Sequence, residues 1–513
     1  MTPRILAAAL ALGCSAAATA QRPAPDQLVA YAQAAAEASV PELRALLAVP
    51  NDAHDPEQVE ANVQWAEGAF AERGFRTRRL DTGGPPLLLA ERAADVADAA
   101  DADTLLVYLQ MDGRPVDPAF WRQPSPYEAV LKEEVAGEGD VGVTWAAFRQ
   151  NWRDEVRVYA RSASDAKGPV MAFLTAVDAL RQNGLDVAHH LKIVLDFEEE
   201  LGSPHLPAAV ARHRDALAAE RLVIFDGPMH ESNRPTLTFG ARGITTVTLE
   251  AFGPRQPQHS GNFGNLVPNP AWDLIHALAP LREPSGRVTL DGWYDGIEVD
   301  EPTRRTLAAV PDDLDAIRAR LALGRFDSIA PTFQEALQVP TLNIRGLHAG
   351  WVREERRTLI PATALVEIDI RTVVESDPAR LLASLRTYLE EEAGFFVVEG
   401  RAPTVVERVN HARTLRWDAE TSYAAFRTEL DSPIGHWLTG ALEYAHGETP
   451  IRIRTSGGSI PISPFVTTLG IPAVTVPTVN RDNNQHAPNE NLRMGNYRDG
   501  VITMMAVLMT GVE

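Results

Sequence analysis

Four carboxylates follow three short apolar stretches of the sequence that are typical of buried strands. They are Asp165, Glu199, Glu200 and Asp226. In a parallel sheet the carboxyl ends of the strands meet at one edge, and ligands bind there. Two adjacent carboxylates at a strand end diverge, so Glu199 and Glu200 can do different work. One can bind a cation while the other stays free as a general base.

A histidine would complete such a cation site, because carboxylates and imidazole are ordinary ligands of divalent metals. His486, in the polar segment 483–490, is the candidate. A plainer interpretation also fits, since acidic residues near strand ends are often solvated or cap helices. Asp165 could cap a helix that begins near Gly168. Spacing alone leaves the metal site and the helix cap open.

The elements that must position these groups alternate between strand-like and helix-like stretches. Apolar residues that recur on one face predict helices, and short apolar runs predict strands. Helices are predicted over residues 26–48, 56–73, 169–180, 204–219 and 433–446, and strands over 87–90, 105–109, 156–160, 191–197, 222–225, 450–454 and 472–476. This alternation indicates an α/β fold with a mainly parallel sheet and helices on both faces.

The pattern of apolar and polar residues changes after Arg242-Gly243. Residues 244–251 alternate apolar and polar side chains, as a half-exposed strand does. Strands at 364–373 and 395–399 and helices at 271–282 and 378–392 follow. We predict an inserted α+β domain at 241–402, which interrupts a catalytic domain made of residues 21–240 and 403–513.

The first 20 residues are predicted to be a signal peptide. Arg4 precedes an apolar run at 5–12, and Ala18-Thr19-Ala20 fits a cleavage site. The protein is therefore expected to be secreted, or periplasmic in a host with an outer membrane. A lipoprotein cleavage box at Cys14 is a poorer match, and a buried N-terminal helix is the alternative interpretation. Cleavage would remove Cys14, the only cysteine, so no disulfide is expected.

Charge and hydropathy disfavour several classes of partner. The chain has 69 acidic and 48 basic residues and a formal net charge of −21. Such an acidic protein is a poor candidate for binding nucleic acid or anionic lipid through bulk charge. Beyond the signal peptide the sequence has no apolar run of the roughly 18 residues that a membrane span needs, so no span is expected.

Nine stretches, taken together, resemble the M20-type zinc metallopeptidase family, which includes dipeptidases, glutamate carboxypeptidase and aminoacylase. The stretches are RSASDAKG at 161–168, EELGS at 199–203, DG at 226–227, RG at 242–243, HSGNFG at 259–264, IPA at 360–362, Arg371, GGSIP at 457–461 and HAPNE at 486–490. Each is weak alone, but all occur in the order of the family and span nearly the whole chain after residue 20.

The resemblance implies a metal centre with an adjacent base. Asp165 would bridge two metal ions, with Glu200 and His486 completing one site and Asp226 belonging to the other. Glu199 would be the general base that takes a proton from water.

The resemblance also implies residues that hold the substrate. His259, in the inserted domain, would stabilise the developing oxyanion, often from across a dimer. Arg371 would bind the terminal carboxylate of the substrate, with Gly458 and Ser459 beside it. A homodimer through the inserted lid domain is therefore expected, and residues 244–251 could supply an edge strand to it. Arg371 could instead form an ion pair at the domain interface.

One position departs from the family. Members usually carry His-x-Asp before the bridging aspartate, whereas this chain has Gln110 and Asp112 in LQMDGRPVDP at 109–118. A neutral amide oxygen is a poorer zinc ligand than imidazole. Asp112 remains, although its usual task is to orient the missing ring. We therefore expect one tightly bound zinc, with the second site weak or suited to another divalent metal.

The function implied is a secreted metal-dependent hydrolase. It would cleave an amide bond of a small peptide with a free carboxylate, using water activated by the metal and Glu199 as base. One alternative is an amidohydrolase of N-acyl amino acids. The other is a binding protein on a decayed enzyme scaffold, because of Gln110. The presence of Glu199, His259, Arg371 and His486 favours an enzyme.

Overall fold

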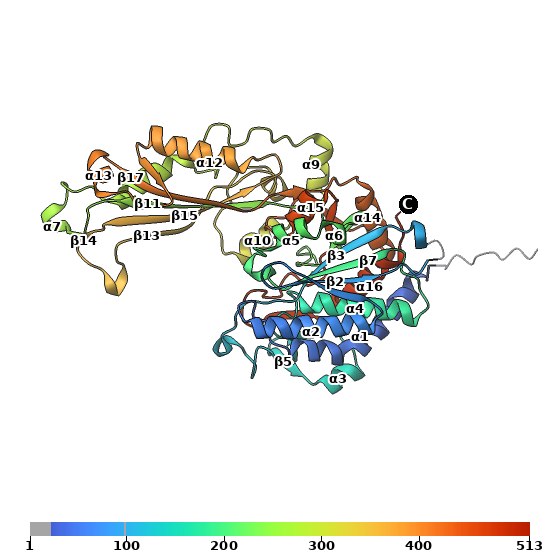
Figure 1. The fold of residues 1–513 in the computed structure, drawn as a ribbon. Coiled ribbons are helices and arrows are strands. Elements are labelled where there is room, and N and C mark those ends of the chain that lie inside the picture. Colours follow the sequence, from blue (N-terminus) through green and yellow to red (C-terminus); the bar gives the residue numbers. More distant parts are fainter. Residues whose placement is uncertain (1–21, 97–98, 513) are drawn as a thin grey trace, which may run out of the picture.

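The computed structural model describes residues 22–96 and 99–512, which form a body of helices and strands and a long arm (Figure 1). The predicted signal peptide, residues 1–20, lies outside the described residues and stays a prediction. None of the described helices combines the length and the hydropathy that crossing a membrane requires.

An eight-stranded sheet runs through the body, in the order β1-β2-β7-β3-β8-β20-β9-β19. Its strands are β1 Arg76–Leu80, β2 Leu87–Arg92, β3 Thr104–Gln110, β7 His190–Asp196, β8 Arg221–Ile224, β9 Thr236–Thr238, β19 Ile451–Ile453 and β20 Ala473–Thr475. The central run β7-β3-β8-β20 is parallel throughout. Antiparallel pairs occur toward both edges, at β1-β2, β2-β7 and β20-β9. The predicted α/β class with a mainly parallel sheet is confirmed.

Helices cover both faces of this sheet. One group is α1 Pro25–Leu47, α2 Pro56–Glu72, α4 Lys167–Gln182, α14 Pro433–His446 and α16 Met494–Met509, and the other is α5 Leu206–Arg212, α6 Arg214–Leu217 and α15 Ser463–Leu469. In β3, Leu105, Val107 and Leu109 belong to the core of the first group, whereas Leu106 and Tyr108 belong to the core of the second. Because both faces are covered, β3 is a nearly continuous apolar run.

Local signals fix where several helices begin. Helices α1, α2 and α14 start at Pro25, Pro56 and Pro433, because proline at the first position gives up no helical hydrogen bond. The Asp55 carboxylate caps α2 by accepting from two backbone N–H groups. The predicted helix at 204–219 is in fact two short helices, α5 and α6. Helix α16 is buried on nearly all sides, so its sequence shows no amphipathic period.

A small antiparallel sheet lies beside the large one. It has the order β21-β6-β4-β5, with β4 Val130–Val135, β5 Gly139–Val143, β6 Arg157–Tyr159 and β21 Asn491–Arg493. The placement of residues 156–160 in the parallel sheet was therefore wrong. Strand β6 pairs instead with β21, which directly follows the His486 segment. This pairing brings the loop that carries Asp165 close to the loop that carries His486.

The arm is built on a five-stranded sheet with the order β13-β15-β11-β17-β16. Its strands are β11 Gly243–Phe252, β13 Asn343–Ala349, β15 Thr363–Thr372, β16 Phe396–Glu399 and β17 Thr414–Tyr423. Helices α8 Pro270–Leu278 and α12 Pro378–Thr387 pack against it, and side chains of β11 alternate between buried and half-buried. That alternation is the expected one, because one face of the sheet is covered and the other is open.

Two details of the arm differ from the prediction. Strand β17 pairs with β11 along its whole length, so the inserted unit continues to Tyr423 and the predicted end at residue 402 was too early. Strand β11 also lies in the middle of the sheet, between β15 and β17. Residues 244–251 are therefore not an edge strand; the edges are β13 and β16.

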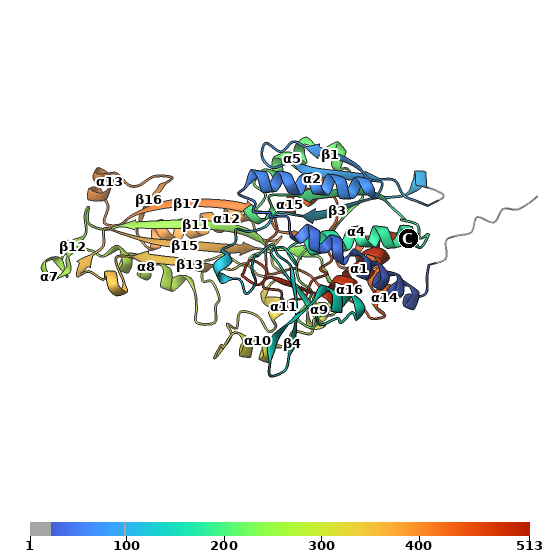
Figure 2. The same cartoon turned by 90° about the horizontal axis from the view of Figure 1, so that it is seen from below.

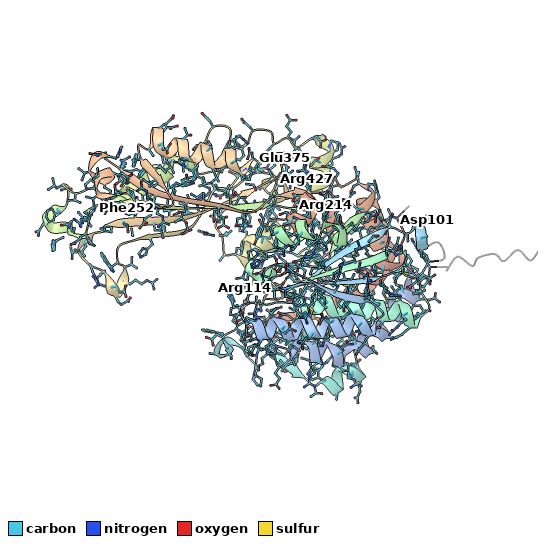
Figure 3. All side chains as sticks on the ribbon, in the orientation of Figure 1. Asp101, Arg114, Arg214, Phe252, Glu375 and Arg427 are labelled. Carbon is cyan, nitrogen blue, oxygen red and sulfur yellow. The ribbon has the colours of Figure 1, made fainter. Side chains whose placement is uncertain are left out.

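Short elements complete the chain. They are α3 Trp145–Gln150, α7 Ser260–Phe263, α9 Glu301–Ala308, α10 Leu314–Arg320, α11 Phe333–Ala336, α13 Val405–Asn410, β10 Gly240–Ala241, β12 Gln258–His259, β14 Leu359–Ile360 and β18 Phe426–Arg427. Strands β12 and β14 and helix α7 lie at the far end of the arm (Figures 1 and 2). Where the arm meets the body, an Arg427 nitrogen lies 2.9 Å from a carboxylate oxygen of Glu375 (Figure 3).

Candidate active site

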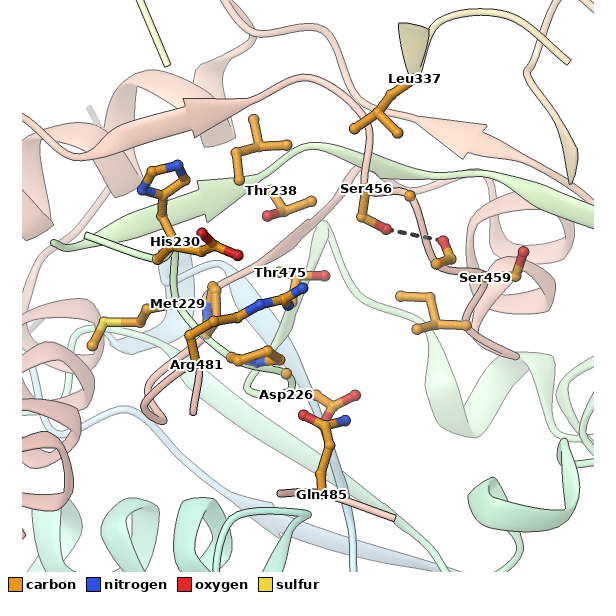
Figure 4. A pocket seen from close by; sticks show the side chains of 18 of the residues that line it. Asp226, Met229, His230, Thr238, Leu337, Ser456, Ser459, Thr475, Arg481 and Gln485 are labelled. Atoms are coloured by element: carbon orange, nitrogen blue, oxygen red, sulfur yellow. Dashed lines mark hydrogen bonds between the residues drawn. The ribbon is translucent and has the colours of Figure 1, made fainter. Parts of the chain in front are cut away.

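The predicted carboxylates gather at the carboxyl edge of the parallel strands. Gln110 is the last residue of β3, Asp226 follows β8, and Glu199 begins a short turn after β7. Together with Asp165 and His486, these residues line one cavity of about 590 Å³ (Figure 4). The sheet edge expected from the sequence therefore lines a cavity in the folded chain.

Asp165, Glu200 and His486 converge on one point. His486 Nε2 lies 3.0 Å from Asp165 Oδ2 and 3.2 Å from Glu200 Oε2. One possible ligand atom from each residue lies within 4.8 Å of the other two. Both carboxylates are buried, and the imidazole is partly exposed. Two carboxylate oxygens and an imidazole nitrogen form a donor set that suits zinc, with room for a further ligand.

Burial raises the pKa of several carboxyl groups at this edge. It raises the pKa of Glu200 to about 7, and the charge of Asp165 adds to the effect. Burial and the same neighbour raise the pKa of Asp226 to about 7. Burial, followed by the charge of Asp226, raises the pKa of Glu199 well above its usual range. A divalent cation would favour the ionised carboxylates, so the residues present fit a metal ion.

Arg114 and His486 both contact these carboxylates. Arg114 Nε lies 3.0 Å from Glu200 Oε2, on the same oxygen that faces His486. The hydrogen bond to Asp165 raises the pKa of His486. Neither group cancels the raised pKa of Glu200, because burial is the largest cause of that shift.

Glu490 holds the loop that presents Asp165. Its buried carboxylate accepts from Arg161 Nη1 at 2.8 Å, from the backbone N–H groups of Ser162, Ser164 and Asp165 at 2.9 to 3.0 Å, and from Ser164 Oγ at 3.0 Å. Sequence reasoning included Glu490 in a motif without giving it a task. The available signal was the place of Glu490 in the same motif as His486. That motif therefore carries one metal ligand and also the residue that holds the loop of another, Asp165.

Gln110 and Asp112 have separate tasks in this structure. Gln110 Nε2 donates to Asp165 Oδ1 at 2.8 Å, and Gln110 Oε1 is buried with no partner among the described residues. Asp112 Oδ2 accepts from the backbone N–H of Glu200 at 2.8 Å, while its Oδ1 is buried and has no partner within the described chain. Asp112 therefore positions the turn that carries Glu200. This differs from the role that the family implies, in which the aspartate orients a histidine ring.

The predicted substrate residues lie at another side of the cavity. Gly458 and Ser459 line it, and Ser459 Oγ accepts a hydrogen bond from Arg371 Nη1 at 2.8 Å. Arg242 donates to the backbone oxygen of Gly457 and so holds the same glycine loop. Arg371 thus reaches the cavity through Ser459, although it comes from strand β15 of the arm.

His259 is the one predicted site residue that lies away from this cavity. It ends β12 at the far end of the arm and is exposed, and its ring accepts from the backbone N–H of Gly261 at 3.1 Å. Within a single chain the structure does not bring His259 to Asp165, Glu199 or Asp226.

Sequence reasoning missed several residues of the site. Gln485 Nε2 donates to Asp165 Oδ2 at 3.3 Å, and its position beside His486 was the available signal. His230 and Gln334 line the cavity and hold Asp312, at 3.3 Å and 2.9 Å respectively. Arg481 also lines the cavity (Figure 4). These last residues lie in no motif and become neighbours only in the folded chain.

Known proteins are similar to this chain along much of its length. Residues 135–510 match the family described as Peptidase family M20/M25/M40. The chain is 25% identical over 422 residues to the Beta-Ala-His dipeptidase of Homo sapiens, covering 81% of this chain and 75% of that protein. It is 27% identical over 356 residues to a Cys-Gly metallodipeptidase of Schizosaccharomyces pombe, covering 67% and 71%.

Solved structures share the fold. An M20 family metallo-carboxypeptidase from Sulfolobus solfataricus superposes with a TM-score of 0.75 at 24% identity, covering 92% of this chain and 98% of that chain. Human carnosine dipeptidase 1 gives a TM-score of 0.73 at 24% identity, covering 95% and 99%. The family match extends over most of the chain and includes Asp165, Glu199, Asp226 and His486, although Gln110 lies before it. The chain therefore belongs to Peptidase family M20/M25/M40 and is a metallopeptidase-type hydrolase.

Proposed function

We propose that this protein is a secreted metal-dependent dipeptidase that hydrolyses small peptides with a free terminal carboxylate. One observation carries the proposal: Asp165 and His486 of the metal group line the same cavity as Ser459, which accepts a hydrogen bond from Arg371. A forked guanidinium suits a carboxylate. The named relatives that are dipeptidases support a substrate of this size.

We assign the metal to Asp165, Glu200 and His486. A zinc ion there would supply Lewis acidity, which polarises an amide carbonyl and makes water more acidic. Glu199 is partly buried and lines the cavity beside these residues. It accepts the proton of the attacking water and returns it to the leaving amine. Asp226 and Gln110 form a second position that is poorer in nitrogen and holds metal weakly.

The test is a hydrolysis screen combined with metal analysis. Unblocked dipeptides should be cleaved by the purified protein, and dialysed samples should keep about one zinc per chain, as expected for three protein ligands with an open position for water. A chelator should remove both metal and activity. Cleavage of N-acyl amino acids alone would make the protein an amidohydrolase instead. Metal binding without hydrolysis of either class would identify a binding protein on the enzyme scaffold.

We also propose a homodimer formed through the arm. The arm exposes apolar side chains, including Leu266 at 76%, Trp272 at 58% and Leu347 at 59% exposure, and such surfaces mark protein interfaces. Strand β13, an edge of the arm sheet, carries Leu347. A dimer would also give His259 a role, because His259 lies far from the cavity of its own chain and would instead serve the cavity of the partner chain. Sedimentation at micromolar concentration should show a dimer, and a fully active monomer would contradict the proposal.

Secretion rests on the N-terminal sequence alone. Cleavage after Ala20 would leave Gln21 as the first residue. N-terminal sequencing of exported protein should begin at Gln21, whereas a chain that keeps Met1 in the cytoplasm would contradict it.

A further inference from the structure

The cavity extends beyond the predicted metal site into a second region, here called the chamber and defined by its walls. These walls come from the loop after β8, from strands β9 and β20, and from the segment of the arm that holds α10 and α11. Figure 4 shows Arg481 entering from the side of Met229 and His230, while Ser459 lies at the opposite side and Asp226 lies between them. The chamber therefore lies away from the Ser459–Arg371 pair.

Arg481 lines this part of the cavity and is exposed. Among the residues that the structure describes, none forms a hydrogen bond or an ion pair with its guanidinium. The carboxylates on its side of the cavity already have partners. Glu231 lies 2.6 Å from Arg320, and Asp312 is held by a histidine and an amide. Arg481 is thus a cationic group with donors to spare.

Two hydroxyls stand opposite each other in the same chamber. Thr238 of β9 and Thr475 of β20 are direct partners in the large sheet, and both line the cavity. Neither hydroxyl makes a side-chain hydrogen bond among the described residues, and both are half-buried (Figure 4). A guanidinium with a pair of free hydroxyls can bind both oxygens of a carboxylate.

We propose that Arg481, Thr238 and Thr475 form a subsite for a carboxylate on the acyl portion of the substrate. The inference rests on the proposed function, because Arg371 and Ser459 must hold the carboxylate of the leaving amino acid for Arg481 to face the acyl side. The preferred acyl group then carries an acid, either the side chain of an aspartyl or glutamyl residue or an N-linked dicarboxylic acyl group. Such a subsite would favour acidic acyl groups among dipeptide-like substrates.

The test compares substrates that differ only in that charge. Glu-Ala and Gln-Ala form one pair, and N-succinyl-alanine and N-succinamoyl-alanine form the other, which separates the two sources of the carboxylate. The metal-loaded enzyme should prefer the acid of one pair by about 10- to 100-fold in kcat/KM, the range of a charge-assisted hydrogen bond. Arg481→Met should lower kcat/KM for the acidic substrates alone and so abolish the preference. Arg481→Lys should keep part of the preference.

Matched variants check the assignment. Thr475→Val keeps the shape of the side chain and should weaken the preference by a few fold, as loss of one neutral hydrogen bond does. Arg234→Met should change nothing, because Arg234 pairs with Glu448 outside this cavity. If Arg481→Met lowers kcat/KM for acid and amide equally, Arg481 acts on the carboxylate cluster and the proposal is overturned. Equal rates for acid and amide in the unmutated enzyme would overturn it too.

A binding measurement separates this inference from the proposed function. Calorimetry should show that glutarate binds more tightly than its monoamide, and that Arg481→Met removes the difference. If the protein hydrolyses no amide but this difference appears, the subsite stands and the dipeptidase proposal fails. If hydrolysis is found but glutarate and its monoamide bind the variant and the unmutated protein alike, the subsite fails and the dipeptidase proposal stands.

Discussion

Neighbouring glutamates in one short turn have different surroundings. Both Glu198 carboxylate oxygens lie 2.9 Å from His205 Nδ1, away from the cavity. Glu199 lines the cavity with Asp165 and Asp226. Only Glu199 is therefore placed to exchange a proton with water beside the predicted metal.

Glu199→Gln should lower kcat by about 10²-fold or more, because the amide keeps the shape of the side chain but cannot accept the proton. Metal content should stay nearly unchanged, since Asp165, Glu200 and His486 remain. Steady-state kinetics and elemental analysis on the same sample measure both. Glu198→Gln is the matched control and should keep most of the activity. Near-normal turnover in Glu199→Gln would show that another group is the base.

Gln110→His should raise the tightly bound metal from one ion to two per chain. The new imidazole would stand where Gln110 now donates to Asp165 Oδ1. Asp112 Oδ1 is buried without a partner in the described structure and can accept from the other ring nitrogen. Elemental analysis after dialysis decides the result. Two tightly held ions in the unmutated protein would mean that the amide is already an adequate ligand.

At the scale of elements, a loop and a strand pair build the metal site. The loop between β6 and α4 carries Asp165, and the segment before β21 carries His486. Pairing of β6 with β21 brings these segments together, and Glu490 fastens one to the other. The geometry of the ligands thus depends on a buried ion pair between Glu490 and Arg161, at 2.8 Å.

Glu490→Gln should destabilise the fold by about 3 kcal/mol or more, because it leaves Arg161 charged, buried and unpaired. The affinity for metal should fall as well, since the amide cannot accept from all the N–H groups that position Asp165. Urea unfolding and a metal titration measure the two effects. Asp482→Asn removes an exposed partner of Arg157 from the same segment and should cost about 1 kcal/mol or less. Equal losses in the two variants would contradict this role for Glu490.

At the scale of the whole molecule, β12, which ends at His259, lies at the far end of the arm, away from the strands of the body (Figure 2). The proposed dimer would let the arm of one subunit reach the body of the other. In such a dimer each cavity would depend on residues of both chains. Exchange of subunits between two variants therefore tests the proposal without a substitution in the interface.

Mixing two inactive variants, Glu199→Gln and His259→Ala, should restore activity. In a mixed dimer one cavity has both Glu199 and the partner's His259, so random exchange of subunits should recover about a quarter of normal activity. Activity measured after the subunits have been dissociated and reassociated checks it. Each variant treated alone is the control. No recovery, with mixed dimers shown to be present, would mean that His259 does not act across subunits.

The sequence by itself determined the chemistry of the site. Asp165, Glu199, Glu200, Asp226 and His486 were identified from residue type, from their places after apolar strands and from the family motifs. Those signals are local, because burial on both faces makes β3 a nearly continuous apolar run and gives β7 the apolar stretch 193–195, and both strands end at polar groups. The α/β class followed from the same alternation of strands and helices.

Only the tertiary structure decided which segments pair. Strand β6 is three residues long, so its sequence specifies an extended backbone but not the partner β21, more than 300 positions away. The middle place of β11 and the end of the arm at β17 likewise depend on long-range pairing. Arg481 and the Thr238–Thr475 pair carry no motif, and they meet only because strand order places them around one cavity. Side-chain periodicity encodes which face is buried, whereas the choice of neighbour depends on the packing of the whole chain.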